Sequence, residues 1–214
     1  MKRPVLITAG ATRNPLDSMR VITANSSGKT GVSLAISLNA LGFEVTVYGS
    51  PRALAILPSN LQSEEFGSTR NLESLMHNWV VQHPKGIIIH CAAVGDFEYR
   101  GQTNKKIPSG QSITIELHPA PKILDQLKEW SETSVIVSFK AAAPNTSNTH
   151  LLEIAQSQLE RTGSDWVFAN VLGRTERDVL IVESTNAVWF TKRQDGLQAL
   201  IERLQQFSLS EQQH

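Results

Sequence analysis

Short apolar runs alternate with amphipathic segments along most of this chain. Runs such as Val5–Thr8 and Ile87–Cys91 are apolar at nearly every position, which is typical of parallel strands buried on both faces. Segments such as Lys29–Leu41 place apolar residues three or four positions apart, which predicts helices with one buried face. The regular alternation predicts an α/β fold with a doubly wound, mostly parallel, Rossmann-like sheet.

The same pattern predicts the remaining elements. The predicted strands are Val5–Thr8, Glu44–Tyr48, Leu61–Phe66, Ile87–Cys91, Ile113–Leu117, Ser134–Phe139 and Asp165–Ala169. The predicted helices are Lys29–Leu41, a segment from Ser68 or Thr69 to Val80, Lys122–Trp130 and His150–Arg161. Residues Gly101–Gly110 are polar and flanked by glycine, so we expect a loop there. Val179–Glu183 and Ala187–Thr191 predict a C-terminal antiparallel hairpin, followed by a last helix through Leu204.

Composition narrows the class of protein. The 214 residues suit one large domain, which we expect to span residues 1–214. Lysine and arginine balance aspartate and glutamate at 20 each, so no nucleic-acid partner is expected. The single cysteine, Cys91, fits a reducing compartment, and no apolar run is long enough for a signal peptide or a membrane span. We therefore expect a cytoplasmic protein without membrane contact.

The loop between the first strand and the first helix carries the strongest chemical signal. It contains Gly10, then Ser26, Ser27 and Gly28 directly before a helix start. Glycine lets the backbone approach an anion, and the free N–H groups of a helix start favour negative charge. The glycine spacing matches neither a dinucleotide fingerprint nor a Walker loop, so we predict phosphate binding by a less common loop. The alternative is a surface connection in which a serine only caps the helix.

Three later segments fall at the ends of predicted strands or between them. Small residues after Cys91 would let a flat ligand lie against the backbone, and Asp96 could hold Mg²⁺, hold a sugar hydroxyl or only cap a turn. The lysines of the Gly101–Gly110 loop could fold over a triphosphate or simply be solvated. Phe139 could stack on a base or belong to the core. The histidines show no metal-ligand spacing, and Cys91 is more typical of a buried apolar residue than of a nucleophile.

Taken in order, these motifs resemble the phosphopantothenate–cysteine ligase family. The resemblance is carried by Val5–Asp17 with Arg20, by Ser26–Gly31, by Cys91–Asp96, by Lys106-Ile107, by Pro121–Leu124, by Ser138–Lys140 and by Asp165–Asn170. It covers nearly the whole chain and fits the free-standing form without a flavin-dependent decarboxylase domain. It implies an amide bond formed between 4′-phosphopantothenate and L-cysteine through an acyl-nucleotide, in coenzyme A biosynthesis.

The resemblance also implies cofactors, partners and residue roles. The activating co-substrate would be CTP or ATP with Mg²⁺, and the protein would be a homodimer whose pairing helps to complete the site. Catalytic roles would fall to Asn25, Lys106 and Arg20, and a metal role to Asp96. Binding of the nucleotide would fall to Gly10, Ser26, Ser27, Gly28, His90, Cys91, Ala92, Asp96, Pro121, Lys122, Ile123, Leu124, Phe139 and Arg161.

The chain departs from the family pattern at three places. Ala24 occupies the position of an asparagine that holds the acyl-nucleotide in the family. Either the loop shifts by one residue so that Asn25 serves, or the intermediate is held differently, or the acid has changed. Val171 replaces an aspartate, and only Arg161 lies where the family carries lysines for the triphosphate. A divergent ligase with another acid or amine is therefore an alternative. An NAD(P)-binding oxidoreductase is another, although no acidic residue closes the second strand, and a non-enzymatic interaction module is a third.

Overall fold

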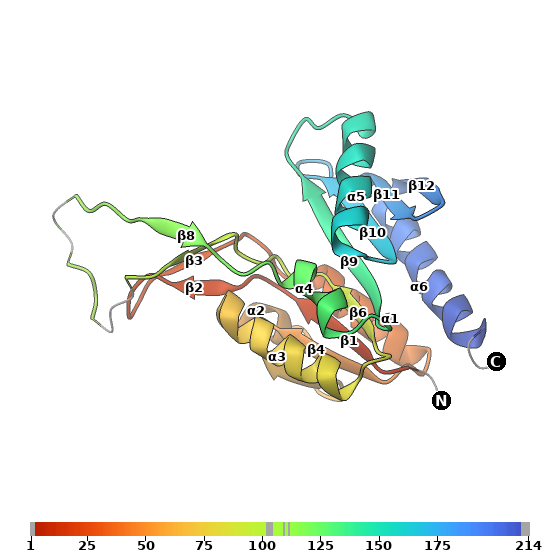
Figure 1. The fold of residues 1–214 in the computed structure, drawn as a ribbon, viewed down its shortest axis with the longest axis horizontal. Helices are drawn as coiled ribbons and strands as arrows, with labels where there is room; N and C mark the ends of the chain where they lie inside the picture. The colour runs from red at the N-terminus through yellow and green to blue at the C-terminus, as the bar shows by residue number, and fades with distance from the viewer. Residues whose placement is uncertain (1–2, 102–104, 109, 111, 211–214) are drawn as a thin grey trace.

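An eight-stranded sheet lies between two layers of helices in the computed structural model, which describes residues 3–101, 105–108, 110 and 112–210 (Figure 1). The sheet is made of β1 (Val5–Ala9), β4 (Val45–Gly49), β5 (Gln62–Glu65), β6 (Ile87–His90), β9 (Val135–Ala142), β10 (Trp166–Val171), β11 (Arg177–Glu183) and β12 (Asn186–Lys192). Four short strands lie outside it: β2 (Arg13–Pro15), β3 (Val21–Thr23), β7 (Phe97–Tyr99) and β8 (Leu117–Pro119).

The strand order of the large sheet is β12-β11-β10-β9-β6-β1-β4-β5. The strands from β5 to β10 pair in parallel, whereas β11 and β12 add an antiparallel edge. The chain begins at β1 in the middle, proceeds to β4 and β5 on one side, and then crosses to β6 on the other side. The order therefore reverses between β1 and β6, which confirms the predicted doubly wound fold, and ligands of such sheets bind at this reversal.

Helices cover both faces of the sheet. They are α1 (Lys29–Ala40), α2 (Pro51–Leu54), α3 (Thr69–Gln82), α4 (Ile123–Trp130), α5 (Asn148–Thr162) and α6 (Arg193–Ser210). Helices α1 and α6 pack on one face, with Val5, Ile7 and Ile89 among the apolar residues that they cover. Helices α3, α4 and α5 pack on the other face. The double cover explains why the central strands are apolar at successive positions.

A long arm projects from this body, at the left of Figure 1. We define the arm as residues 13–23 and the described residues of 97–119. It holds two small antiparallel sheets, β2–β3 and β7–β8, and β2 packs against β7. Apolar side chains are exposed along it, including Met19 at 69% and Phe97 at 50%.

Some expected elements differ from those observed. The strand expected at Ile113–Leu117 is wrong: β8 covers Leu117–Pro119, because its partner β7 sets the register, and residues 112–116 form neither strand nor helix. The hairpin β2–β3, strand β7 and helix α2 were not expected. The C-terminal hairpin and the last helix are confirmed, and the described residues of Gly101–Gly110 form a loop as expected.

Candidate active site

A cavity of about 740 Å³ opens at the carboxyl ends of β1, β6, β9 and β10. The residues that line it fall into five groups: Ala24–Gly31, His90–Asp96, Pro121–Asp125, Phe139–Ala141, and the separate residues Gln158, Arg161, Asn170, Leu172, Thr175 and Arg193. The cavity thus lies where the strand order reverses, as expected for a ligand site in this class of sheet.

The N-terminus of α1 forms one wall of the cavity. Gly28 is its N-cap residue, has φ +76° and provides no side-chain cap. A Cβ atom at Gly28 would lie 2.5 Å from the Ala53 Cβ and 2.9 Å from the Gly10 amide nitrogen. Only glycine therefore lets the loop lie this close to the end of β1. The Lys29 amide donates to Ser27 Oγ at 3.5 Å. The next amides of α1 have no partner within the helix, so they are available to an anion in the cavity.

His90 closes the end of β6 and presents a neutral ring to the cavity. The buried Thr8 hydroxyl accepts a hydrogen bond from the Ala92 amide at 3.1 Å and lies 3.0 Å from His90 Nδ1. The hydroxyl can donate its proton to Nδ1, and in that tautomer the ring proton lies on Nε2. Burial lowers the pKa of His90 to about 4, so the ring is uncharged at neutral pH. It can donate a hydrogen bond but adds no charge.

Cys91 follows directly and is a free thiol that lines the cavity. Burial raises the pKa of the Cys91 thiol well above its ordinary value, although the Arg193 charge acts in the opposite direction. The thiol therefore stays protonated at neutral pH. This state does not favour a nucleophilic role, because the thiolate is the reactive form.

Two ion pairs lie at the rim of the cavity. Lys122 Nζ pairs with Asp96 Oδ1, and both side chains are more than half exposed. Arg161 Nη1 pairs with Asp125 Oδ1. Such exposed pairs contribute little to stability and exchange readily for a charged ligand. Both cations are therefore available to an anionic ligand of the cavity.

Phe139 lies in the second half of β9 and lines the cavity. Its centroid is 5.1 Å from that of Phe168, and the two rings stack at 27°. The preceding residue, Ser138, accepts a hydrogen bond from Gln158 Nε2 at 3.0 Å and another from Ser164 Oγ at 2.9 Å. The ring of Phe139 therefore packs on Phe168, and the hydrogen bonds of Ser138 fix the neighbouring residue of the strand.

Most of the predicted site residues meet in this cavity. Asn25, Ser26, Ser27, Gly28, His90, Cys91, Ala92, Asp96, Pro121, Lys122, Ile123, Leu124, Phe139 and Arg161 all line it. Gly10 lies just behind the loop, against Gly28. Arg20 and Lys106 do not line it, because both belong to the arm.

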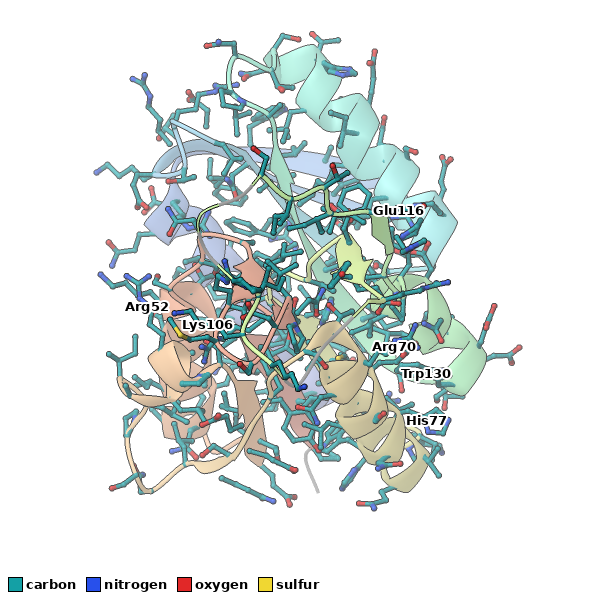
Figure 2. The ribbon with its side chains drawn as sticks, turned by 90° about the vertical axis from the view of Figure 1, so that its left-hand side faces the viewer. Arg52, Arg70, His77, Lys106, Glu116 and Trp130 are labelled. Carbon is teal, nitrogen blue, oxygen red and sulfur yellow. The ribbon has the colours of Figure 1, made fainter. Side chains whose placement is uncertain are left out.

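The arm positions Arg20 through a buried carboxylate. Arg20 Nε donates to Asp17 Oδ2 at 2.9 Å, and the Ile107 amide donates to the same oxygen at 2.9 Å. Arg20 Nη2 also donates to the Ile107 carbonyl at 2.8 Å. These contacts hold the pKa of Asp17 well below its usual range. Lys106, next to this anchor, is exposed and lies well apart from Glu116 across the arm (Figure 2).

Four linked residues are among those of the cavity that were not predicted as site residues. Thr30, Asn170, Thr175 and Arg193 line it, and Arg193 donates hydrogen bonds to each of the other three. Asn170 belongs to the Asp165–Asn170 motif, but the sequence predicts no role for it. Arg193 lies 163 positions from Thr30 in a helix without a motif, so only the tertiary fold reveals the contact.

The described residues contain neither a candidate membrane helix nor a candidate metal cluster. Within the described ranges, every helix is too short or too polar to cross a membrane. No three His, Cys, Asp or Glu side chains of these residues gather where they could hold a metal ion. The cytoplasmic location stays a prediction.

Comparison with known proteins identifies relatives over nearly the full length. The family model described as DNA/pantothenate metabolism flavoprotein C-terminal domain matches residues 1–210. The Coenzyme A biosynthesis bifunctional protein CoaBC of Thermococcus kodakarensis is 37% identical over 182 residues, which are 83% of this chain and 44% of that protein. The chain thus spans less than half the length of this relative.

Solved structures share the fold. The DNA/pantothenate metabolism flavoprotein from Streptococcus pneumoniae has a TM-score of 0.84 and 25% identity, with 96% of this chain and 99% of that chain covered. A Cab2 variant in complex with phosphopantothenate-cysteine has a TM-score of 0.73 and 22% identity, with 96% of this chain and 88% of that chain covered.

Proposed function

The chain belongs to the family of the DNA/pantothenate metabolism flavoprotein C-terminal domain, and from this membership we propose that it joins 4′-phosphopantothenate to L-cysteine in coenzyme A biosynthesis. The name of the Thermococcus relative supports the pathway. The observation that carries the proposal is the cavity at the strand reversal, where the uncapped start of α1 meets His90, Phe139 and two rim cations. This set of groups suits a nucleotide better than a neutral ligand.

We propose an acyl-nucleotide route, because a carboxylate does not react with an amine unless its oxygen becomes a leaving group. A carboxylate oxygen of the acid bonds to the α-phosphorus of CTP or ATP. The bond from that phosphorus to the bridging oxygen breaks, and pyrophosphate leaves with the electron pair. The cysteine amine then attacks the acyl carbon, releases a proton to solvent and displaces the nucleoside monophosphate.

The residues of the cavity can support these steps in different ways. The Ser26–Gly28 turn and the first amides of α1 would hold the phosphates, where negative charge grows as pyrophosphate departs. His90 Nε2–H would donate to the ligand without competing for a proton. The nucleoside would lie against Phe139 and the Pro121–Leu124 segment.

Mg²⁺ fits this cavity only as a companion of the nucleotide. Asp96 and Asp125 are the carboxylates that line it, and each has an oxygen engaged by a cation. Mg²⁺ is commonly bound through one or two carboxylates and substrate phosphates rather than by a protein cage. Asp96 would serve as that carboxylate after Lys122 has turned to the phosphates, and the ion would neutralise phosphate charge when bound.

We further propose a homodimer in which the arm docks on a second copy. Two-stranded sheets are marginal in isolation, and this arm exposes Met19, Phe97 and Leu117. Arg20 and Lys106 lie on the arm and not in the cavity of their own chain. Docking of the arm would protect its apolar side chains and bring these cations to the partner's cavity.

A second candidate function is a related ligation with another acid. Asn25 lines the cavity beside Ala24, which has no side-chain amide to donate. A different acid would need a different donor at this point. The ligase proposal instead assigns the donor role to the Asn25 amide.

The test is release of pyrophosphate by the purified protein. We expect release with CTP or ATP only when 4′-phosphopantothenate is present, and amide product only when L-cysteine is added. Release with another carboxylic acid but not with phosphopantothenate would favour the second candidate. No release with either nucleotide and any acid would contradict the proposed function, and omission of the acid is the matched control.

A further inference from the structure

We propose that Arg193 is the fixed positive charge that holds the polyphosphate of the nucleotide in this cavity. This inference rests on the proposed function and adds a residue for which neither a sequence motif nor a comparison suggests a role. Arg193 is the first residue of α6, and α6 packs against α1. The chain therefore brings a cation from its C-terminal helix to the start of its first helix.

The guanidinium is held by three separate elements. Nη2 donates to Thr30 Oγ1 in the first turn of α1 at 3.1 Å. Nη1 donates to Asn170 Oδ1 at the end of β10 at 3.1 Å, and to the Thr175 carbonyl at 3.4 Å. The guanidinium carbon also lies 5.1 Å from the centroid of the Phe168 ring. A side chain held from several directions is preorganised, so ligand binding loses little side-chain entropy.

All of these partners are neutral. Among the described residues, no carboxylate forms an ion pair with the Arg193 guanidinium. The main-chain amide of Arg193 donates to the Glu176 carbonyl at 2.9 Å. Burial lowers the pKa of the Arg193 guanidinium, and the Glu176 charge partly opposes this change. Arginine nevertheless stays protonated in proteins. A half-buried cation without a paired carboxylate is costly unless an anion binds beside it.

Two N–H groups of the Arg193 guanidinium remain available for a ligand. The guanidinium carries five N–H groups, and the three contacts above leave the Nε–H and one Nη2–H without a partner among the described contacts. No buried side-chain nitrogen of the described residues lacks a partner, so Nε must reach open space. Arg193 lines the cavity, and we assign the cavity as the space that this donor faces. Two such N–H groups beside the uncapped start of α1 suit phosphate oxygens.

In the described part of the chain, four other cations line the cavity: Lys29, Lys122, Lys140 and Arg161. The two at the rim that form ion pairs differ from Arg193. Lys122 and Arg161 are exposed and already paired with aspartates. Arg193 is therefore ready before the ligand arrives, whereas the rim cations must first exchange partners. We therefore assign initial binding of the polyphosphate to Arg193. The rim cations would contact it later, after they release their aspartates.

The experiment measures binding of inorganic pyrophosphate and of ATP and CTP by calorimetry, together with the rise in melting temperature that each ligand causes. The variants are Arg193→Gln and Arg193→Lys. Arg203→Gln is the matched control, because Arg203 lies on the same helix, contacts the Ala199 carbonyl and does not line the cavity. We expect roughly a 10- to 100-fold loss of affinity in Arg193→Gln, partial recovery in Arg193→Lys and no change in the control.

The thermal data separate binding from a structural role. A purely structural Arg193 would lower the melting temperature without ligand and leave the pyrophosphate-induced rise unchanged, and that result would overturn the inference. Unchanged affinity in Arg193→Gln would also overturn it while the ligase proposal stands. If the wild-type protein bound neither pyrophosphate nor triphosphate, the proposed function and this inference would both fail.

Discussion

The cavity and the arm are built in opposite ways. The cavity rests on strands buried on both faces, and its loop packs so closely that Gly28 has no room for a Cβ atom. The arm consists of two small sheets with exposed apolar side chains. The buried Asp17 carboxylate joins its two segments, and pairs such as Arg70–Glu98 join its base to the body. The body therefore holds a candidate binding site formed within one chain, whereas the function proposed for the arm requires contact with a second chain.

The largest effect is expected where the cavity has least room. Gly28→Ala would place a methyl group 2.5 Å from the Ala53 Cβ and force an L-residue into φ +76°. Because the loop must move away, the amides of α1 would no longer point at the phosphates. The rate of pyrophosphate release should therefore fall on the order of 1,000-fold. The measurement is the steady-state rate of pyrophosphate release.

Gly173→Ala is the matched control for that change. Gly173 has φ +88°, but nothing lies within 4 Å of a Cβ atom built there. Both variants carry the strain of a left-handed backbone, and only Gly28→Ala adds a clash. Equal activity in the two variants would show that close packing of the loop does not position the phosphates.

The next effect concerns the arm and its lysine. Lys106→Ala should lower turnover roughly 100-fold, because a cation that approaches the reacting phosphates stabilises the charge of the transition state. The melting temperature should stay within about 1 °C, since Lys106 is exposed and outside the core. Lys85→Ala, at another exposed lysine, is the control. Full activity in Lys106→Ala would remove this residue from the mechanism.

The contrast between body and arm also decides what the sequence could predict. Val5–Thr8 and Ile87–Cys91 were predictable as strands because burial on both faces makes them continuously apolar. The three-residue strands β2 and β7 were not predictable, because each is mostly polar or exposed. Each is also too short to show a repeating pattern of apolar and polar positions. The register of β8 depends on its pairing with β7, a contact between segments about twenty residues apart that no local pattern contains.

The residues of the candidate site also fall into a predictable and an unpredictable group. The Ser26–Gly28 turn and the Cys91–Asp96 segment were predictable because glycine and small residues at strand ends have few structural uses. The contact of Arg193 with Thr30 was not predictable, because an arginine at a helix start is ordinary in sequence and acquires its role only when α6 packs on α1. The arm location of Arg20 likewise depends on the unexpected hairpin β2–β3.

A smaller effect tests whether the arm serves a second chain. Arg20→Ala should lower turnover about 30-fold, because a charge-assisted contact to the substrate is lost. If the arm acts across a dimer, mixing Arg20→Ala with Gly28→Ala should restore activity. Half of the dimers would then be mixed, with one intact site each, so about a quarter of the wild-type rate should return. No recovery after confirmed subunit exchange would mean that Arg20 acts within its own chain.

The smallest effect is a difference in how the two regions respond to acid. His90 has a pKa of about 4 in the folded protein, below the unfolded value of about 6.5, so its neutral form is favoured by folding. That stabilisation is complete above pH 6.5 and is lost as the pH falls toward 4. Between pH 7 and 5.5 the free energy of unfolding should decrease by about 1 kcal/mol from this group.

The arm should not share this sensitivity. The pKa of Asp17 is lowered by Arg20, so Asp17 stays ionised in both states above about pH 5, and its contribution declines only in stronger acid. Urea unfolding at pH 7 and pH 5.5 measures the difference. His90→Gln should flatten the decrease, whereas His77→Gln, at an exposed histidine, should leave it unchanged (Figure 2). If Asp17→Asn flattened the decrease instead, the acid sensitivity would belong to the arm, and the buried His90 would not be the group that titrates.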